Sequence, residues 1–390
     1  MLVSNAINPT RRRRLLPRAR LAAIAVGGVL TLSTAFLTAG SASAFASTGG
    51  SSFNFGNNTS TVYAETNQTA GNAVIVYSAD PGGGLTQIAS VPTGGTGTGT
   101  SPGSQGGVTL GDNGRLLAVV NGGSNSVSVF SAGFSGQLRL IDTTSSGGID
   151  PISVTINGLW VYALNAGSST TSANIAGFNL FFPHPVGAQP LNASASSPEQ
   201  ISYTPNGRDL LVTEKASNTI DVFPVNFFGL AEPAVTTTVA TGTGPYGFAF
   251  NQNGDAVVSD AGISSLSSFS VNPNGTLTAI SGPVSDGQAA PCWVALTSNG
   301  REAFTANAHS GNVSAYTVAP NGSLSLLSPA VQTSVNVGDT DLAVAGNSTL
   351  YISDQPNFDA STITPSGALS PSAVAASGLP AGTFGLAATD

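Results

Sequence analysis

The sequence has no second cysteine, since Cys292 is the only one among 390 residues. An intramolecular disulfide is therefore excluded, and stability must come from the burial of apolar side chains. We expect this lone thiol to be buried. Charged residues are also scarce, at 8%, but hydrophobic residues reach 41%, a balance that argues against a disordered chain. The 48 Gly and 23 Pro favour an all-β fold with many turns.

Basic residues are few and unevenly distributed, because six of the 11 Lys and Arg precede residue 21. The apolar run Leu21–Leu37 follows them, and then come the small-residue sequences Ala42-Ser43-Ala44 and Ala44-Phe45-Ala46. This order is typical of a bacterial secretory signal peptide. We predict a signal peptide at residues 1–46, a flexible segment at residues 47–56, and a secreted or extracytoplasmic protein. The alternative is an uncleaved membrane anchor, and the arginine run leaves Sec and twin-arginine export both open.

Positive charge is scarce in the remainder of the chain. Without residues 1–46, five Lys and Arg stand against 19 Asp and Glu, which gives a formal net charge of −14. This charge argues against a nucleic-acid partner, because phosphate binding needs clustered Lys and Arg. We expect a monomer with no membrane span once the signal peptide is removed.

A two-residue turn recurs along the chain at intervals of 44 to 49 residues. Its copies are Asn113-Gly114, Asn157-Gly158, Asn206-Gly207, Asn253-Gly254, Asn299-Gly300 and the variant Gly346-Asn347. Asn-Gly between apolar strands is a strong hairpin signal, because both positions of the expected turn need positive φ. A second turn, of the form Pro273-Asn274-Gly275 or Pro320-Asn321-Gly322, follows in the same unit. Four strands per unit at this period predict a β-propeller, whereas a sandwich or β-solenoid explains the two turns poorly.

The two ends of the repeat predict how the propeller closes. Residues 59–90 hold a second, a third and a fourth strand but no first strand, and Gly382–Ala388 resembles a first strand without successors. We therefore predict a seven-bladed β-propeller at residues 57–390, with four antiparallel strands per blade and the C-terminal strand completing the first blade. Such closure removes exposed sheet edges. We expect Gly94–Gly107 to be a flexible loop between blades.

Strand order sorts the loops onto two faces. Loops that lead into a first strand, or that follow a second strand, share what we call the channel-mouth face, and the Asn-Gly and Pro-Asn-Gly turns share the opposite turn face. The second strands end on Asn67, Asn121, Asn165, Glu214, Asp260, Asn307 and Asp354. Such side chains commonly bond to the backbone of the following loop. The acids that replace the common Asn are the better candidates for function.

Acidic residues gather in the loops that lead into first strands. We expect ligand-binding residues around the channel mouth at Asp150, Glu199, Tyr246, Trp293, Asp339, Asp341 and Asp354. An acidic mouth could hold Ca²⁺ through oxygen ligands, or raise the pKa of a carboxylate into the range of a general base. The alternative is a solvated polar rim.

The candidates for catalysis are Glu214 and Asp260, which would activate water, and Lys215 and His309, which would stabilise an oxyanion. Lys215 is the one Lys or Arg that we assign to the channel-mouth face. A lone loop histidine is more often a bystander. The sequence contains no nucleophile elbow, zinc-ligand spacing or phosphate-binding loop.

Four segments carry a resemblance to a known family: Ser124–Phe130, Pro205–Thr213, Ser217–Phe223 and Gly311–Tyr316. They resemble repeats of the lactonase-type seven-bladed β-propellers, relatives of 6-phosphogluconolactonase and the fungal carboxymuconate lactonizing enzyme. The resemblance covers residues 57–390 and implies a propeller and a lactonase-type activity. Family enzymes lead into a first strand through Gly-Pro-Arg-His, whereas the matching segments here are Gly244–Gly247 and Ala290–Trp293. Both lack the Arg and the His, which argues against a phosphorylated sugar lactone.

The sequence favours an exported scaffold that binds a small molecule, a polymer or a protein through the channel-mouth face. Low charge and the missing Arg-His pairs support this interpretation. The alternative is a lactonase-like hydrolase that uses carboxylate-activated water on a non-phosphorylated lactone or ester.

Overall fold

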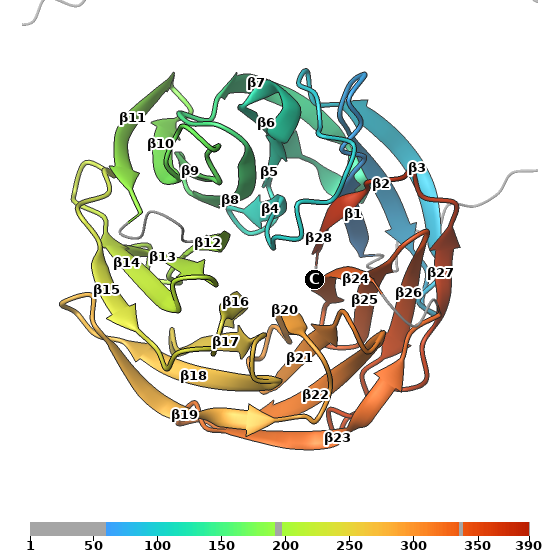
Figure 1. Ribbon diagram of the computed structural model, residues 1–390. Coiled ribbons are helices and arrows are strands. Elements are labelled where there is room, and N and C mark those ends of the chain that lie inside the picture. The colour runs from blue at the N-terminus through green and yellow to red at the C-terminus, as the bar shows by residue number, and fades with distance from the viewer. Residues whose placement is uncertain (1–59, 192–196, 335–337, 390) are drawn as a thin grey trace, which may run out of the picture. The chain divides into compact units, whose positions relative to one another are not determined.

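Seven four-stranded antiparallel sheets form a ring around a central channel in the computed structural model (Figure 1). The structure describes residues 60–191, 197–334 and 338–389, without the side chains of Pro183, Ser328, Pro329, Asp339 and Thr340. The predicted signal peptide and flexible segment lie outside the described residues. The sheets are the blades of the predicted seven-bladed propeller, which is confirmed. No helix of the described residues is long and apolar enough to cross a membrane.

We number the blades in chain order. The first contains β28 Phe384–Ala388, β1 Thr61–Glu65, β2 Ala73–Ala79 and β3 Leu85–Pro92; the second contains β4 Val108–Gly111, β5 Leu116–Asn121, β6 Ser126–Ala132 and β7 Leu138–Ser145. The third contains β8 Pro151–Asn157, β9 Trp160–Asn165, β10 Asn174–Asn179 and β11 Phe182–Pro190; the fourth contains β12 Pro198–Tyr203, β13 Asp209–Glu214, β14 Thr219–Pro224 and β15 Val235–Thr238. The fifth contains β16 Pro245–Phe250, β17 Ala256–Asp260, β18 Ser265–Val271 and β19 Leu277–Ser285. The sixth contains β20 Pro291–Leu296, β21 Glu302–Asn307, β22 Asn312–Val318 and β23 Leu324–Gln332; the seventh contains β24 Asp339–Ala345, β25 Thr349–Asp354, β26 Asn357–Thr362 and β27 Ala373–Ser377. Two short 3-10 helices, η1 Gly122–Ser124 and η2 Phe134–Gly136, lie in the second blade's loops.

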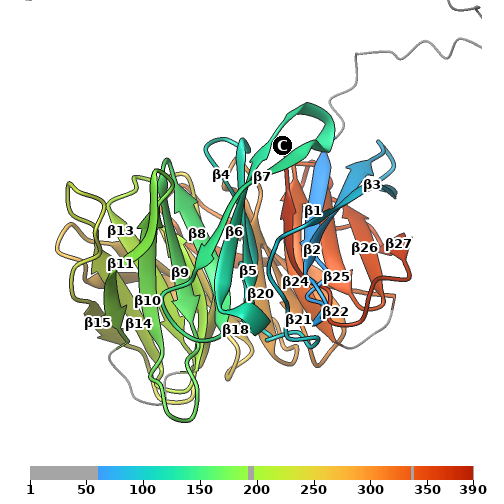
Figure 2. The same cartoon turned by 90° about the horizontal axis from the view of Figure 1, so that it is seen from above.

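The position of a strand in its blade sets its composition. In β13 the central residues are all buried, because neighbouring blades cover both sides of the sheet there, and the strand reads as a continuous apolar run. The outer strand β3 is mostly exposed or half-buried and carries Thr, Gln and Ser. Seen from the side, the strands run between the two faces that the loops define (Figure 2).

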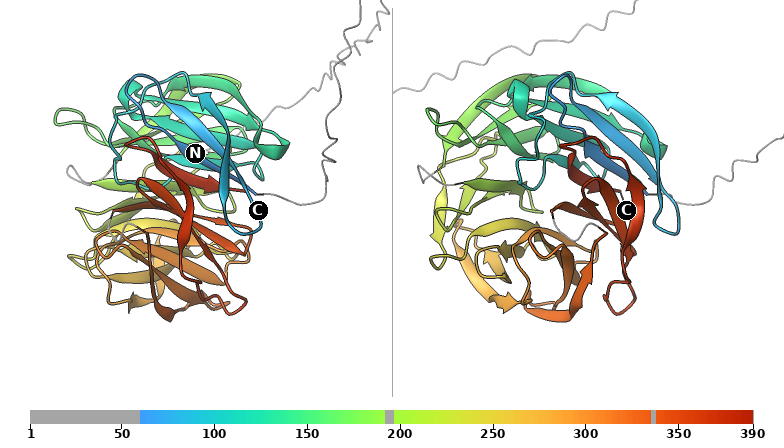
Figure 3. Two further views of the ribbon diagram at one scale, coloured as in Figure 1. Left: turned by 90° about the vertical axis from the view of Figure 1, so that its right-hand side faces the viewer. Right: turned by 45° about the vertical axis from the view of Figure 1, so that its right-hand side comes forward.

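The C-terminal strand closes the ring as predicted. β28 pairs antiparallel with β1, with Val62 opposite Ala388 and Ala64 opposite Leu386. The last strands of the chain therefore lie beside the first strands (Figure 3). The first blade thus joins both ends of the described chain.

The hairpin turns are present, but their geometry differs from the prediction. Gly takes positive φ in each Asn-Gly turn, for example +69° at Gly207 and Gly300, whereas Asn does so only at Asn113. In the fourth blade four loop residues lie between Thr204 and Asp209, which are joined by a backbone hydrogen bond. Asn206 Oδ1 accepts hydrogen bonds from the Arg208 N–H and the Thr204 hydroxyl. A four-residue loop of this kind needs positive φ only at its glycine.

The second strands end on a ring of buried polar residues, which are Glu65, Asn121, Asn165, Glu214, Asp260, Asn307 and Asp354, each at most 1% exposed. The member from the first blade is Glu65, not the predicted Asn67, because β1 ends two residues earlier. The members bond to neighbouring strands and loops: Asn121 donates to Ser128 Oγ, and Asp260 accepts from Ser267 Oγ at 2.5 Å. Both bonds tie the end of the second strand to the third strand of the same blade.

Candidate functional site

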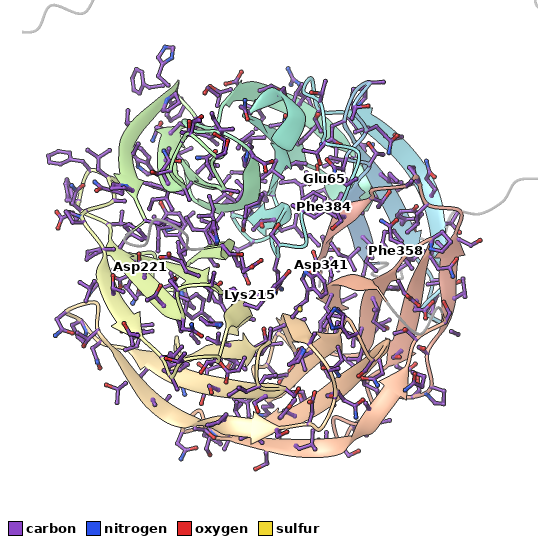
Figure 4. All side chains as sticks on the ribbon, viewed as in Figure 1. Glu65, Lys215, Asp221, Asp341, Phe358 and Phe384 are labelled. Carbon is purple, nitrogen blue, oxygen red and sulfur yellow. The ribbon has the colours of Figure 1, made fainter. Side chains whose placement is uncertain are left out.

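A pocket of about 680 Å³ opens on the channel-mouth face between the third, fourth and fifth blades. It is lined by Pro102, Asp150, Ile152, Ala166, Ser168–Ala173, Ser197–Glu199, Lys215 and Tyr246. Four of the predicted site residues, Asp150, Glu199, Lys215 and Tyr246, are thus brought together. Figure 4 shows Lys215 beside the central opening, with Asp341 on the opposite side.

Glu199 is the more buried of the two acids that line this pocket. It lies in β12, next to Pro198, and is 6% exposed. Burial raises the pKa of its carboxyl group to about 7, and the positive charge of Lys215 limits the rise. Ser197 Oγ donates to Glu199 Oε1 at 3.0 Å, and the Tyr246 hydroxyl also hydrogen-bonds to the carboxyl group. This carboxyl group is therefore poised to exchange a proton near neutral pH.

Lys215 and Tyr246 complete the polar wall. Lys215 is exposed, and its Nζ lies 5.0 Å from the centroid of the Tyr246 ring. Burial and the nearby Glu199 raise the pKa of the Tyr246 hydroxyl far above its usual value, so the hydroxyl stays protonated and can donate a hydrogen bond. A flexible ammonium group and a fixed hydroxyl group thus face the same cavity as the Glu199 carboxyl.

Asp150 lies on the third-blade side of the pocket. Its backbone has a φ of +54°, and its N–H donates to Asn125 Oδ1 at 2.7 Å. Burial raises the pKa of its carboxyl group. The neighbouring loop Ser168–Ser172 adds exposed hydroxyl groups to the same wall.

The segment Pro102–Gly106 crosses the channel mouth. It leads into the second blade, yet the Gln105 side chain bonds both to the Val294 N–H at 3.0 Å and to the Val294 carbonyl at 2.7 Å in the sixth blade. The Gln105 N–H donates to the Glu199 carbonyl in the fourth blade at 3.1 Å. We call Pro102–Gly106 the cross-channel segment. It forms part of the loop Gly94–Gly107 that was predicted to be flexible, and the glycine content gave no sign of the Gln105 hydrogen bonds. The flexibility of the loop as a whole stays a prediction.

Trp293 contacts this segment and is not among the residues that line the pocket. It is 4% exposed, its Nε1–H donates to the Ser104 carbonyl at 3.0 Å, and its ring lies edge-on to Tyr246 at 5.7 Å. Gly247 leaves room for the crossing, since a Cβ there would lie 2.2 Å from Gln105 Oε1. The lone thiol of Cys292 is buried as predicted, and burial raises its pKa to about 12.

Asp341 lies deep beside the channel and joins the seventh blade to the first. Its Oδ2 accepts a hydrogen bond from the Leu386 N–H at 2.8 Å, and its Oδ1 accepts from the Leu342 N–H at 2.8 Å. Burial raises the pKa of this carboxyl group to about 7. It does not line the pocket, although its charge is felt at Tyr246.

The remaining predicted site residues lie outside the pocket lining. Glu214 is buried and accepts a long hydrogen bond of 3.4 Å from Ser217 Oγ. Asp260 is buried in the fifth blade, and Asp354 accepts a hydrogen bond from Ser334 Oγ. His309 is an exposed loop residue of the sixth blade. The Asp339 side chain is not among those described. The catalytic and ligand-binding roles predicted for these five residues stay predictions.

The structure also adds pocket residues that the sequence analysis did not single out. These are Pro102 and the hydroxyl-rich loop Ser168–Ser172. The loop follows the second strand of its blade, so the assignment of such loops to the channel-mouth face was the available signal. The predicted Ca²⁺ site stays a prediction, and no group of three or more Asp, Glu, His or Cys among the described side chains could hold a metal ion.

Comparison with known proteins identifies relatives of this fold. A family model described as "Lactonase, 7-bladed beta-propeller" matches residues 42–175 and 256–342, more than half of the chain. None of the curated proteins compared with the chain matches it.

Three similar solved structures come from bacteria. The periplasmic gluconolactonase PpgL of Pseudomonas aeruginosa has a TM-score of 0.67 and 15% identity, over 85% of this chain and 99% of that one. A candidate 6-phosphogluconolactonase of Bacteroides fragilis has a TM-score of 0.64 and 18% identity over the same shares. A protein of Lactobacillus plantarum has a TM-score of 0.68 and 15% identity, again over 85% and 99%. At these identities the similarity establishes the fold.

Proposed function

Because this chain belongs to the seven-bladed lactonase propeller family, we propose that it hydrolyses a small, uncharged lactone in the pocket that Glu199 lines. The observation that carries the proposal is the buried Glu199 carboxyl group, with a pKa of about 7, beside Lys215 and Tyr246. A general base works best when its pKa lies near the working pH. Glu199 therefore takes the role that the sequence assigned to Glu214 or Asp260.

The proposed chemistry is attack of water on the lactone carbonyl. Glu199, as the carboxylate, removes a proton from the water as its oxygen bonds to the carbonyl carbon. The Lys215 ammonium and the Tyr246 hydroxyl stabilise the negative charge that develops on the carbonyl oxygen. The ring C–O bond then breaks, and the proton held by Glu199 passes to the departing alkoxide, which yields the open-chain hydroxy acid. The carboxylate is thereby restored to its starting state.

Charge and hydroxyl groups define the proposed substrate class. Lys215 is the one Lys or Arg in the pocket lining, which also contains Asp150 and Glu199. A phosphate group would lack the clustered cations that bind it well. The Ser168–Ser172 hydroxyls instead suit a polyhydroxylated, uncharged ring. Gluconolactone is the first compound to test, since the Pseudomonas aeruginosa relative is a gluconolactonase.

The test is hydrolysis of a panel of uncharged and phosphorylated lactones by the propeller, followed as acid release at constant pH. We expect turnover of at least one uncharged lactone and a loss of roughly 100-fold or more in kcat for Glu199→Gln, as for removal of a general base. Glu302→Gln, on the turn face, is the control and is expected to keep full activity. The activity of Glu214→Gln tells whether Glu199 or Glu214 is the base. Absence of turnover with every lactone would refute the proposal. Loss of activity only in Glu214→Gln would show that Glu214, and not Glu199, is the general base.

A second candidate function is binding of a sugar-like ligand or polymer without turnover. The exposed hydroxyl groups of Ser168–Ser172 beside Asp150 favour it, because hydroxyl and carboxylate groups bind sugar hydroxyls. In this case Glu199→Gln would change affinity, measured by calorimetry, with no hydrolysis in either protein.

The proposed setting of the protein is outside the cytoplasm. This rests on the N-terminal pattern of Arg11–Arg14, Leu21–Leu37 and the Ala-x-Ala sequences. N-terminal sequencing of the protein from the culture fluid or periplasm would test it. Recovery of the intact N-terminus in the membrane fraction would point to the anchor instead.

A further inference from the structure

Five exposed phenylalanines lie in or directly after the turns between the third and fourth strands of three successive blades. They are Phe134 in the second blade, Phe181 and Phe182 in the third, and Phe227 and Phe228 in the fourth, with exposed fractions of 98%, 72%, 76%, 98% and 73%. Every other phenylalanine among the described residues is buried or half-buried. We call these five residues the phenylalanine rim. It lies on the turn face, opposite the pocket.

The turn does not need aromatic residues to form. In the fourth blade the Asn226 N–H donates to the Leu230 carbonyl at 2.9 Å, and the Gly229 N–H donates to the Asn226 carbonyl at 2.8 Å. The fifth blade repeats both bonds, from Asn272 to Thr276 and from Gly275 to Asn272, at 2.9 Å each. Gly229 and Gly275 have φ of +79° and +80°. Phe227 and Phe228 therefore occupy the places of Pro273 and Asn274 on the same backbone.

Asparagine side chains hold the backbone of the turns that carry these rings. The Phe228 N–H donates to Asn226 Oδ1, and the Phe181 N–H donates to Asn179 Oδ1, each at 3.0 Å. The Phe227 and Phe228 rings stand edge-on, 5.6 Å apart. Exposed aromatic groups that gather on one face are a candidate surface for an apolar partner.

We propose that the phenylalanine rim inserts into the surface of a phospholipid bilayer. Aromatic tips that project from separate turns suit a soft apolar phase, which closes around each tip, better than they suit a flat protein surface. The described chain begins at Ser60 on this same face, where the Ala79 N–H donates to the Ser60 carbonyl. Thr61 opens β1 there, and a Cβ at Gly136 beside Phe134 would lie 3.1 Å from the Thr61 methyl group.

The charges around the rim set how binding depends on salt. Three of the five Lys and Arg after residue 20, Arg115, Arg139 and Arg208, lie in or beside turns of the second and fourth blades, and all three are exposed. Asp112, Asp142 and Asp209 lie close to them in the sequence and balance their charge. Arginine can bind lipid phosphate groups, but the balanced charge leaves apolar insertion as the driving force. Binding is therefore expected to survive physiological salt.

The experiment is flotation of the propeller, residues 56–390, with vesicles of phosphatidylcholine and phosphatidylglycerol. This part forms a compact unit of its own, and its use removes the apolar run as a source of binding. The matched variant Phe227→Pro with Phe228→Asn copies the turn of the fifth blade, Asn272–Gly275. We expect it to lower the vesicle partition coefficient by roughly tenfold or more, from the apolar area lost. Adding Phe134→Pro with Ser135→Asn is expected to lower it further.

Thermal unfolding checks that the variants are folded, and Phe227→Ser with Phe228→Ser replaces the first variant if that one is not. Failure of the wild-type propeller to float, or equal flotation of wild type and variants, would overturn the proposal. Self-association of the wild type in sedimentation velocity that the variants lose, without flotation, would also overturn it, since a second copy would then cover the rim.

Discussion

At the residue scale, the buried acids show how one position of the repeat can carry different chemistry. The second strands end on Asn in the second, third and sixth blades and on Asp or Glu in the others. The sequence pattern predicted six of these seven residues, and it made Glu214 and Asp260 candidates for catalysis. Their burial was not predictable, because the same Asn or Asp pattern also occurs at exposed loop starts.

Asp260→Asn is expected to stabilise the protein at neutral pH. Burial raises the pKa of Asp260 from 3.8 to about 7, so the unfolded chain loses this proton before the folded protein does as pH rises. The stabilisation linked to the protonated group is complete below about pH 4 and is lost as pH rises through about 7. The gain for Asn at pH 8 is at most about 4 kcal/mol, since one pKa unit corresponds to about 1.4 kcal/mol.

Denaturant unfolding at pH 4 and pH 8 measures this difference. Asn307→Asp, the reverse change at the equivalent position, is the matched control and is expected to destabilise at pH 8. A stability of Asp260→Asn that falls with pH as steeply as the wild type would contradict the assignment.

At the element scale, the cross-channel segment is the feature that was predicted least well from the sequence. Its glycine content predicted flexibility, and the contacts that fix it come from Val294 and Trp293, almost 190 residues away. The local sequence does not indicate which distant residues will be its hydrogen-bond partners. The strands were easier, because the alternation and the turn residues that define them are local.

Gln105→Ala is expected to weaken both the fold and the pocket. It removes the partners of the buried Val294 N–H and carbonyl groups, and each unsatisfied group costs about 1–3 kcal/mol. It also loosens the backbone that bonds to the Glu199 carbonyl, so KM is expected to rise more than kcat falls. Thermal unfolding and steady-state kinetics measure the two effects. Gln137→Ala, at an exposed turn-face position, is the control, and equal behaviour of the two variants would argue against a role for the cross-channel segment.

At the scale of the whole molecule, the ring, its closure and the face that carries the pocket were predictable, whereas the position of the pocket on that face was not. Repeated turns and the orphan strand at Gly382–Ala388 indicate seven blades and their closure without any distant contact. The pocket instead depends on which loops of the third, fourth and fifth blades project furthest, and on where Pro102 crosses. Those features follow from three-dimensional packing.

Deletion of residues 380–390 is expected to abolish the cooperative unfolding of the propeller. It removes β28 and leaves β1 and the Asp341 carboxyl group without their partners at Leu386. An open ring exposes a sheet edge, which favours aggregation. Calorimetry and light scattering measure the outcome, with deletion of residues 1–55 as a control expected to leave the transition unchanged. A truncated protein with a wild-type transition would show that closure contributes little.

The most direct test of the proposed function is the pH dependence of kcat/KM for an uncharged lactone. If Glu199 acts as the base, kcat/KM rises roughly tenfold per pH unit below its pKa and levels off above about pH 7. The Glu199→Gln variant is expected to lose both this rise and most of the activity. A wild-type profile that is flat from about pH 5 to 8 would contradict the account, as would a Glu199→Gln variant that keeps the wild-type profile.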